Sequence, residues 1–461
     1  MHVYNTATKR VEEFIPREAG KVSLYVCGLT PYDALHLGHA RTFLVYDMMR
    51  RYLEWRGLQV THVQNITDLD DKVIARAHAL NASPAALAAR YTEESLKDCD
   101  ALGILRAHRY PRVTEHIPEV LALIRRLLDR GYAYVAPSGS VYFRVRAFPR
   151  YGRLAGRTME GGAEAQARVN ADSGKLFSAD FVLWKPAKTG EPSWESPWGP
   201  GRPGWHIECS AMASTHLGPQ IDLHGGAIEL LFPHHENEAA QTEAAFGVHP
   251  TVRYWVHCGV VTVNGRKMAK SVGNVVSVQE ALAMAPPTIW RLLVLSNHYR
   301  RPLDFRALKR ADVREAIDLR LAPARAAWQR IERFLASTRA SQCLPSDEEG
   351  TAQPLVRTCD ATQAPDAADN VANSLARDCD AMHECFIAAM DGDFSTPAAL
   401  TALFGLIGQA HAALPARQQG DARTRHAALG GVSRTVQATL GVLGFAFEPS
   451  GEVERLGRGR T

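Results

Sequence analysis

Residues 22–66 read VSLYVCGLTPYDALHLGHARTFLVYDMMRRYLEWRGLQVTHVQNI, and this stretch decides the fold. Residues 22–28 form an apolar run that is typical of a buried strand. Over residues 36–56 the apolar side chains recur at helical spacing, and Gly57 is a natural helix stop. Residues 58–66 predict a second strand. A strand, a helix and a strand in this order indicate a parallel sheet, which binds ligands beyond the carboxyl ends of its strands.

The rest of the chain predicts an insertion into this sheet domain and a helical region after it. Residues 132–203 are short segments rich in Gly and Pro, and Asn264–Gly265 is a strong hairpin signal. We see no internal repeat. The expected parts are residues 1–125 and 204–258 for the two halves of the sheet domain, 126–203 for the insertion, 259–305 for a loop and stem-contact region, 306–448 for a helical domain with a mobile loop at 340–372, and 449–461 for a polar tail.

Length and composition indicate a multidomain globular protein. The chain has 461 residues, which is too many for one compact core, and is 46% hydrophobic and 22% charged. No stretch approaches the roughly 20 apolar residues of a membrane helix, and the first residues contain no apolar signal core. Eight cysteines form no CxxC pair. We therefore expect a cytoplasmic protein with reduced thiols and no membrane partner.

The net charge of +4 is modest but unevenly distributed. Residues 299–339 contain eleven basic and five acidic residues, whereas residues 341–400 contain two basic and eleven acidic residues. On charge alone, two solvated faces explain this pattern better than a nucleic-acid surface does. A basic surface for nucleic acid becomes attractive only with independent evidence.

Two short motifs carry groups suited to phosphate chemistry. The sequence His36-Leu37-Gly38-His39 opens the long helix, where free backbone N–H groups and the helix dipole favour anions. The sequence Lys267-Met268-Ala269-Lys270-Ser271 follows the expected hairpin, and lysines on such a loop can close over a triphosphate. Alone, each motif is also explained by polar residues on a solvated surface.

In this combination the two motifs resemble those of class I aminoacyl-tRNA synthetases. Four further segments indicate the member, namely VCGLTPYD (26–33), VQNITDLDDK (63–72), GRPGWHIECSAM (201–212) and FPHHENE (232–238). Together the six look like those of cysteinyl-tRNA synthetases. The resemblance runs from about residue 3 to 335 and resumes at residues 394–404. It implies an α/β protein, with a Rossmann-like parallel-sheet catalytic domain split by an insertion and followed by an α-helical bundle domain.

The resemblance also implies the substrates and the residues that bind them. It implies joining of L-cysteine to the 3′ end of tRNA-Cys, with ATP as substrate, Mg²⁺ beside it, and one Zn²⁺ per chain. The zinc ligands would be Cys27, Cys209, His234 and Glu238. The catalytic residues would be His36, His39, Lys267 and Lys270, with Gly38 and Glu229 also binding ATP. Cys27, Gly28, Thr67 and Trp205 would bind cysteine.

Physical reasoning supports the implied zinc site. His234 and Glu238 are four positions apart, so on a helix they share one face. Two cysteines, one histidine and one carboxylate suit zinc. His235 and Glu236 are the next candidates, but we expect them to point elsewhere on that helix. A soft metal that prefers a thiolate would separate cysteine from serine, which a steric pocket distinguishes poorly.

For tRNA, the basic region supplies candidate phosphate contacts on a helical surface. These are Arg320, Arg325, Arg330 and Arg333, and contacts of this kind position RNA without reading its sequence. We expect the protein to act as a monomer.

The sequence departs from the family pattern at four places. Ala227, Glu229 and Ala269 stand where Gly, Asp and Ser are usual, and all three are near the expected ATP site. The C-terminal end is shortened, and we find no match to a domain that reads the anticodon. Two alternatives therefore remain: a zinc-dependent ligase that transfers cysteine to a small amine, as in mycothiol synthesis, and a weakly catalytic RNA-binding paralogue.

Overall fold

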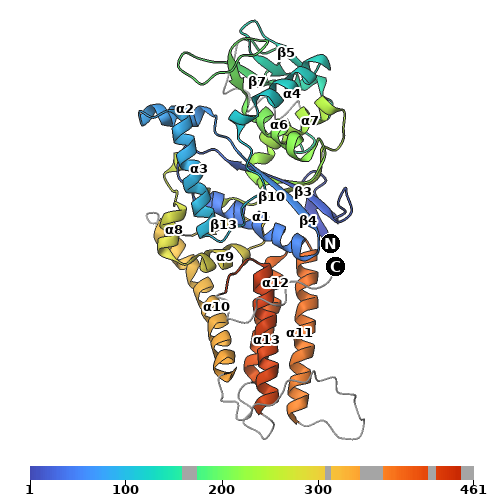
Figure 1. Ribbon diagram of the computed structural model, residues 1–461, viewed down its shortest axis with the longest axis vertical. Helices are drawn as coiled ribbons and strands as arrows, with labels where there is room; N and C mark the ends of the chain where they lie inside the picture. Colours follow the sequence, from blue (N-terminus) through green and yellow to red (C-terminus); the bar gives the residue numbers. More distant parts are fainter. Residues whose placement is uncertain (158–173, 307–312, 343–366, 414–421, 448–461) are drawn as a thin grey trace, which may run out of the picture. The chain divides into compact units, whose positions relative to one another are not determined.

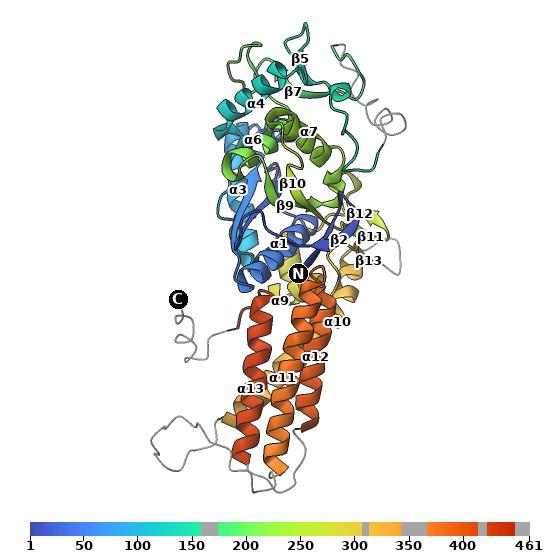
Figure 2. The ribbon, with the colours of Figure 1, turned by 90° about the vertical axis from the view of Figure 1, so that its right-hand side faces the viewer.

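The computed structural model describes residues 1–157, 174–306, 313–342, 367–413 and 422–447. The chain forms two compact units, one of residues 1–287 and 299–318 and the other of residues 288–298 and 319–461. We describe each unit separately (Figures 1 and 2).

A four-stranded parallel sheet forms the centre of the first unit. Its order is β10-β9-β3-β4, and all three pairings are parallel. The strands are β3 (Lys21–Leu29), β4 (Gln59–Ile66), β9 (Ile221–Ala227) and β10 (Val252–Cys258), and α1 (Leu37–Trp55) connects β3 to β4. The predicted parallel sheet is confirmed. From β3 the chain passes to β4 on one side, whereas β9 pairs with β3 on the other side. The strand order therefore switches between β3 and β9, and sheets of this kind bind ligands at such a point.

Apolar side chains fix this arrangement. Along β3 the residues Leu24, Tyr25 and Val26 are at most 1% exposed, because the sheet is covered on both faces. Helix α1 begins at a capping box, in which the His36 ring accepts a hydrogen bond from the Gly38 N–H. Helix α1 therefore begins at the histidine motif, after the short segment that follows the carboxyl end of β3.

The first unit contains further helices, and strands between residues 133 and 203 form a separate sheet. The helices are α2 (Asp71–Ala79), α3 (Pro84–Ala101), α4 (Ile117–Asp129), α6 (Trp205–Leu217), α7 (His234–Phe246) and α8 (Val278–Met284), with 3-10 turns η1 (Val113–Glu115), η2 (Val145–Ala147), η3 (Ile228–Leu231) and η4 (Lys270–Val272). This antiparallel sheet contains β5 (Ala133–Val135), β6 (Val141–Phe143), β7 (Phe181–Pro186) and β8 (Gly201–Pro203) and lies within the region where the sequence predicts an insertion.

Two small sheets complete this unit. One pairs β1 (His2–Asn5) with β2 (Arg10–Glu13). The other contains β11 (Val261–Val263), β12 (Arg266–Lys267) and β13 (Leu303–Phe305). Asn264 and Gly265 between β11 and β12 have φ angles of 51° and 74°, which confirms the predicted hairpin.

The second unit is helical. Its elements are most of α9 (Pro287–Leu295) and α10 (Val313–Gln342), together with α11 (Ala367–Asp391), α12 (Thr396–Ala413) and α13 (Ala422–Val442). Ile331, Phe386, Leu403 and Val436 are at most 1% exposed, so the four long helices share one core. In the expected mobile loop at 340–372, residues 343–366 lie outside the described residues, as does the expected tail at 449–461; residues 340–342 end α10 and residues 367–372 begin α11. Within the described residues, no helix is long and apolar enough to cross a membrane.

Candidate functional site

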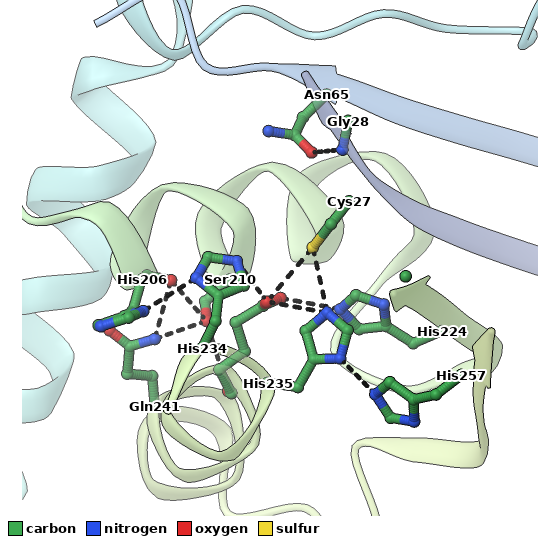
Figure 3. Close-up of polar contacts among 12 residues, drawn as sticks. Cys27, Gly28, Asn65, His206, Ser210, His224, His234, His235, Gln241 and His257 are labelled. Carbon is green, nitrogen blue, oxygen red and sulfur yellow. Dashed lines mark hydrogen bonds and ion pairs between the residues drawn. The ribbon is translucent and has the colours of Figure 1, made fainter. Parts of the chain in front are cut away.

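A buried group of Cys, His and Glu side chains lies at the carboxyl end of β3 (Figure 3). Cys27 comes from β3, Cys209 from α6, and His234 and Glu238 from α7. One ligand atom from each of the four lies within 4.8 Å of all the others. The structure therefore brings together the four residues that the resemblance implied as zinc ligands, and we call them the Cys₂HisGlu cluster.

The helical spacing of α7 explains how two of the four meet. His234 Nε2 is 2.9 Å from Glu238 Oε1, as expected for side chains four positions apart on one face. The other carboxylate oxygen, Glu238 Oε2, is 2.9 Å from His224 Nε2 on β9. The Glu238 carboxylate is therefore held on both sides, with Oε1 facing the cluster.

The electrostatics of the cluster suit a divalent cation with thiolate ligands. A hydrogen bond from Cys27 lowers the pKa of Cys209 to about 6. Burial alone would lower the pKa of His234, but Glu238 and Cys209 raise it to about 10. Burial alone would raise the pKa of Glu238, but the imidazoles of His224 and His234 lower it. Without a metal, hydrogen bonds link these side chains. A metal ion bound here would displace the shared protons and coordinate the same groups.

One expectation about α7 is wrong. We expected His235 to point away from the cluster, but its Nε2 lies 3.3 Å from Cys27 Sγ, and Cys27, His224, His235 and Glu238 form a second group with ligand atoms within 4.8 Å. The reason is that α7 is buried on nearly all sides, so a second face of the helix also meets the sheet. Glu236 does point elsewhere, and accepts hydrogen bonds from the backbone N–H groups of Gly152 and Ala155 at 2.7 and 2.8 Å.

A cavity of about 430 Å³ adjoins the cluster and collects most of the other expected site residues. Its lining includes Cys27, Gly28, His36, Gly38, His39, Trp205, Glu229, Lys267 and Lys270. The cluster residue Cys27 and the aromatic ring of Trp205 therefore line the same cavity as the histidine and lysine motifs. Trp205 lies against His234, with ring centroids 4.3 Å apart.

The two motif histidines are neutral hydrogen-bonding groups rather than cations. Burial, together with Lys270 and Lys267, lowers the pKa of His36 to about 4. Burial also lowers the pKa of His39, and the two rings stack with centroids 3.9 Å apart. At neutral pH, each ring can donate one N–H to an anion without carrying charge itself.

The motif lysines are held by carboxylates on the cavity wall. Lys270 Nζ lies 3.1 Å from Asp33 Oδ2 and 4.5 Å from the centre of the Tyr32 ring, and Lys267 forms an ion pair with Glu229. After the lysines, the chain passes the start of α1, where the backbones of Ser277 and His36 form an antiparallel β-bridge. Both motifs are thus attached to the start of the same helix, and the lysine partners are negative groups that phosphates can replace.

Backbone packing beside the cluster requires glycine at position 28. A Cβ there would lie 1.7 Å from the carbonyl oxygen of Asn65, so β3 and β4 approach too closely for any other residue. The Gly28 N–H donates to Asn65 Oδ1 at 2.9 Å, and Asn65 Nδ2 donates to Thr67 Oγ1 at 3.0 Å. Thr67 is buried in this chain of hydrogen bonds and is absent from the lining of the large cavity.

The four arginines expected to contact tRNA lie on α10, outside this site. Arg330 donates to the carbonyl oxygen of Phe404 at 3.2 Å, and Arg320 donates to Asn297 Oδ1 at 3.0 Å. Arg333 donates to the Gln329 carbonyl oxygen one turn earlier at 3.2 Å. These contacts stabilise the helical unit and leave the role of the arginines towards RNA a prediction.

Comparison with known proteins places the chain in a family. The sequence profile described as tRNA synthetases class I (C) catalytic domain matches residues 13–315, and that of the DALR domain matches residues 385–448. A cysteine–tRNA ligase of Pelotomaculum thermopropionicum is 47% identical over 90% of this chain and 78% of the relative. One of Alkalilimnicola ehrlichii is 43% identical over 96% of this chain and 86% of the relative. The chain belongs to the cysteine–tRNA ligase family.

Solved structures agree on the fold. The methionyl-tRNA synthetase of Mycobacterium tuberculosis in complex with methionyl-adenylate aligns with a TM-score of 0.66 at 16% identity, covering 92% of this chain and 91% of that one. The arginyl-tRNA synthetase of Thermus thermophilus aligns with a TM-score of 0.56 at 14% identity. These two likenesses confirm the expected fold class.

Sequence reasoning missed His224, which belongs to the second ligand group. His224 lies in the segment IDLHGGA, which forms β9, and nothing in that segment shows that His224 meets α7. A polar side chain between Leu223 and Gly225 in a buried strand is the available signal, because such a group needs a hydrogen-bond partner.

Proposed function

We propose that the chain activates L-cysteine with ATP and transfers it to the 3′ end of tRNA-Cys. The observation that carries this proposal is the shared cavity, where the thiol-containing cluster meets the histidine and lysine motifs. Family membership makes this reaction the natural one, because the relatives are cysteine–tRNA ligases. Transfer to a small amine has no specific observation in its favour.

We propose zinc as the resident metal, held by Cys27, Cys209, His234 and Glu238. Two sulfurs, one imidazole and one carboxylate, all buried and within 4.8 Å of one another, are donors that suit zinc. Zinc bound there would accept the substrate thiolate as a further ligand in preference to a neutral hydroxyl. Trp205 would close the side-chain pocket beside His234, and Gly28 would let the substrate approach the backbone of β3. Thr67, which is buried behind Gly28, would help to orient the substrate's amino group.

In the first step, a carboxylate oxygen of cysteine attacks the α-phosphorus of ATP, and pyrophosphate leaves with the electron pair of the broken P–O bond. The neutral rings of His36 and His39 would donate N–H groups to the phosphate oxygens as negative charge develops. Lys267 and Lys270 would leave Glu229 and Asp33 for the β- and γ-phosphates, together with Mg²⁺. Gly38 allows close approach of the nucleotide, and Glu229, once released, can reach a ribose hydroxyl.

In the second step, a ribose hydroxyl at the tRNA 3′ end attacks the carbonyl carbon of the adenylate, and AMP leaves. Arg320, Arg325, Arg330 and Arg333 would contact tRNA phosphates, which position the RNA without reading its sequence. These roles follow from the positive charge of α10.

The test is ATP–pyrophosphate exchange with cysteine and with serine, followed by transfer to purified tRNA-Cys. We expect exchange with cysteine alone and subsequent formation of cysteinyl-tRNA. Exchange without transfer would favour a small-amine acceptor, and the absence of both would favour an RNA-binding paralogue.

A further inference from the structure

A third lysine lines the large cavity besides the two of the lysine motif. Lys72 ends the segment VQNITDLDDK (63–72), and it lines the cavity together with His39, Lys267 and Lys270. It lies in the first turn of α2, which follows the carboxyl end of β4 after a short loop. This lysine therefore reaches the ligand-binding edge of the sheet from an element other than the loop of the motif lysines.

The ammonium group of Lys72 has no carboxylate partner in the part of the chain that the structure describes. The two residues before it are acidic, but both are engaged elsewhere. Asp70 Oδ1 accepts a hydrogen bond from the backbone N–H of Lys72 at 2.8 Å and thereby caps α2. Asp71 forms ion pairs with Lys185, at 2.9 Å, and with Arg202. Each motif lysine has a carboxylate partner, so Lys72 is the cavity lysine whose charge is not compensated by such a pair.

The ring of Tyr32 holds Lys72 at the cavity. The Nζ atom of Lys72 lies 5.7 Å from the ring centre, and that of Lys270 lies 4.5 Å from it. An ammonium group over an aromatic face is attracted by the negative charge of the ring's π electrons. The ring is anchored in turn, because it packs against the apolar core of α2 and α3, which contains Val73, Ala77, Leu87, Ala88 and Tyr91. Although Lys72 is exposed, its charge is therefore held beside that of Lys270.

The positive charges of the three lysines act on the same part of the cavity. Burial and the neighbouring ring of His36 lower the pKa of His39, and the charges of Lys270, Lys267 and Lys72 lower it further. Burial also lowers the pKa of Lys270, and Lys72 adds to this effect. Like charges that lie so close repel one another, and an anion bound among them removes the repulsion. In the proposed reaction, that anion is the triphosphate of ATP.

We propose that Lys72 binds the β- and γ-phosphates of ATP, and the pyrophosphate formed from them, and that Tyr32 positions its ammonium group. This inference rests on the proposed function, which brings ATP into this cavity. Lys267 and Lys270 have to leave their carboxylates before they bind phosphate, whereas Lys72 needs no such exchange. Because Lys72 holds the phosphates before and during the displacement alike, it acts on the KM for ATP more than on the rate of adenylate formation.

The first experiment measures binding of ATP, pyrophosphate and AMP to the full chain by calorimetry without cysteine, so that no reaction occurs. In Lys72→Met the apolar part of the side chain remains and the charge is lost. Affinity for ATP and for pyrophosphate should fall by roughly five- to tenfold, the size of one charge-assisted contact at an exposed site, whereas affinity for AMP should not change. Unchanged binding of ATP, or an equal loss for AMP, would overturn the proposal.

The matched control is Lys21→Met. Lys21 is an exposed lysine at the amino end of β3, where it pairs with an exposed glutamate, and it is absent from the lining of the large cavity. It should leave the affinity for all three ligands unchanged. The effect of Lys72→Met should also shrink as salt is added, because an exposed ammonium group is screened.

The second experiment separates the two steps of the reaction. In Lys72→Met the KM for ATP in pyrophosphate exchange should rise by the same factor as the loss of ATP affinity, and single-turnover adenylate formation at saturating ATP should change by less than about threefold. Transfer from the preformed adenylate to tRNA-Cys should proceed at the wild-type rate. A defect confined to transfer would show that Lys72 contacts the 3′ end of the tRNA, and would overturn the proposal.

A pair of variants tests the positioning role of Tyr32. Tyr32→Phe keeps the aromatic face, so it should keep most of the affinity for ATP. Tyr32→Leu can still pack against the core of α2 and α3 but has no such face, and the affinity for ATP should fall by roughly two- to fivefold with AMP binding unchanged. Equal affinities for ATP in the two variants would contradict the role of the ring. A wild-type chain that binds ATP without pyrophosphate exchange would refute the proposed reaction, whereas the comparison of ATP with AMP would still decide the role of Lys72.

Discussion

Within the cluster, Cys27, Cys209 and Glu238 are 7%, 1% and 3% exposed, whereas the side chains of Lys267 and Lys270 across the large cavity are 51% and 27% exposed. The cluster residues come from three buried elements whose packing sets their distances. The lysines lie on the loop segment from the end of β12 to the start of η4 and are held by ion pairs with Glu229 and Asp33. The fold thus preforms the region that would select the amino acid, while the region that would bind the triphosphate has to exchange partners.

This contrast predicts that the two regions fail in different ways. A change in the buried cluster should weaken metal binding and cysteine selection together, because the same metal would serve both. A change in the loop should slow the reaction of a protein that still holds its metal. The predictions below test this separation, starting with the largest expected effect.

The largest effect is expected from Cys209→Ser. It removes one of the two sulfur ligands, and we expect zinc affinity to fall by on the order of 10²-fold or more, beyond the effect of residues that only support ligands. Cysteine binding should weaken with it, while ATP binding changes little. Metal analysis and separate titrations with the two substrates measure this.

Cys99→Ser is the matched control, because Cys99 is a buried thiol on α3, 6% exposed and outside the cluster. It should keep its zinc. Full cysteine activation by a demonstrably metal-free Cys209→Ser protein would contradict both the zinc proposal and the contrast between the two regions.

On the other side of the cavity, His39→Ala and Lys270→Ala should each slow adenylate formation by on the order of 10²-fold, because the removed groups act on charge that develops in the transition state. Zinc content should stay at the wild-type level. Single-turnover formation of the adenylate is the measurement, with Lys97→Ala as control, since Lys97 pairs with an exposed glutamate on α3 and is absent from the lining of the large cavity.

A wild-type rate in either variant would mean that the motif does not act on the phosphates. Loss of zinc from Lys270→Ala would instead show that the loop and the cluster are coupled, which the contrast between them excludes.

Acid stability provides the baseline for pH studies of both regions. His62 on β4 is 5% exposed, and burial, with smaller effects of Arg50 and His108, lowers its pKa to about 3. In the unfolded chain its pKa is about 6.5, so between these values the unfolded state binds more protons. The stabilisation is complete above pH 6.5 and is lost as the pH falls towards 3.

Lowering the pH from 7 to 5 should therefore cost about 2 kcal/mol of stability through this one group. His62→Leu should reduce the loss by that amount in urea unfolding at the two pH values. The same replacement at His78, which is exposed on α2, should leave the pH dependence of stability unchanged. An unaltered slope in His62→Leu would show that His62 is protonated as readily in the folded state.

The sequence could predict the parts of the fold and the site that depend on neighbouring residues in the chain. The β3–α1–β4 unit and the His234–Glu238 pair depend on local periodicity, and both are found where the sequence placed them. Resemblance supplied the two cysteines, which the sheet brings together across 182 positions between Cys27 and Cys209. Periodicity alone carries no information on that distance.

What the sequence missed depends on register and packing between distant segments. His224 meets Glu238 only because β9 lies beside β3 with a particular register. His235 faces Cys27 because α7 is buried on more than one side, whereas an exposed helix would have had only one contacting face. The carboxylate partners of the lysines, Asp33 and Glu229, likewise come from separate loops.

The smallest effect we predict concerns Asp33→Asn, which tests whether the ion pair with Lys270 competes with ATP. The pair is partly exposed, with side chains 32% and 27% accessible and Nζ 3.1 Å from Oδ2, so its contribution is that of a screened surface pair. Although burial alone would raise the pKa of Asp33, Lys270 lowers it, so the carboxylate is charged at neutral pH. Releasing Lys270 should lower the KM for ATP by about two- to threefold at low salt, a size typical of such pairs.

The difference should vanish near 0.5 M salt, where screening acts over only a few ångströms. Glu93→Gln, which breaks an exposed pair with Lys97 on α3, is the control and should leave the KM unchanged. A rise in the KM for ATP in Asp33→Asn would mean that Asp33 positions Lys270 for the phosphates, and that this lysine is preformed in the way the buried cluster is.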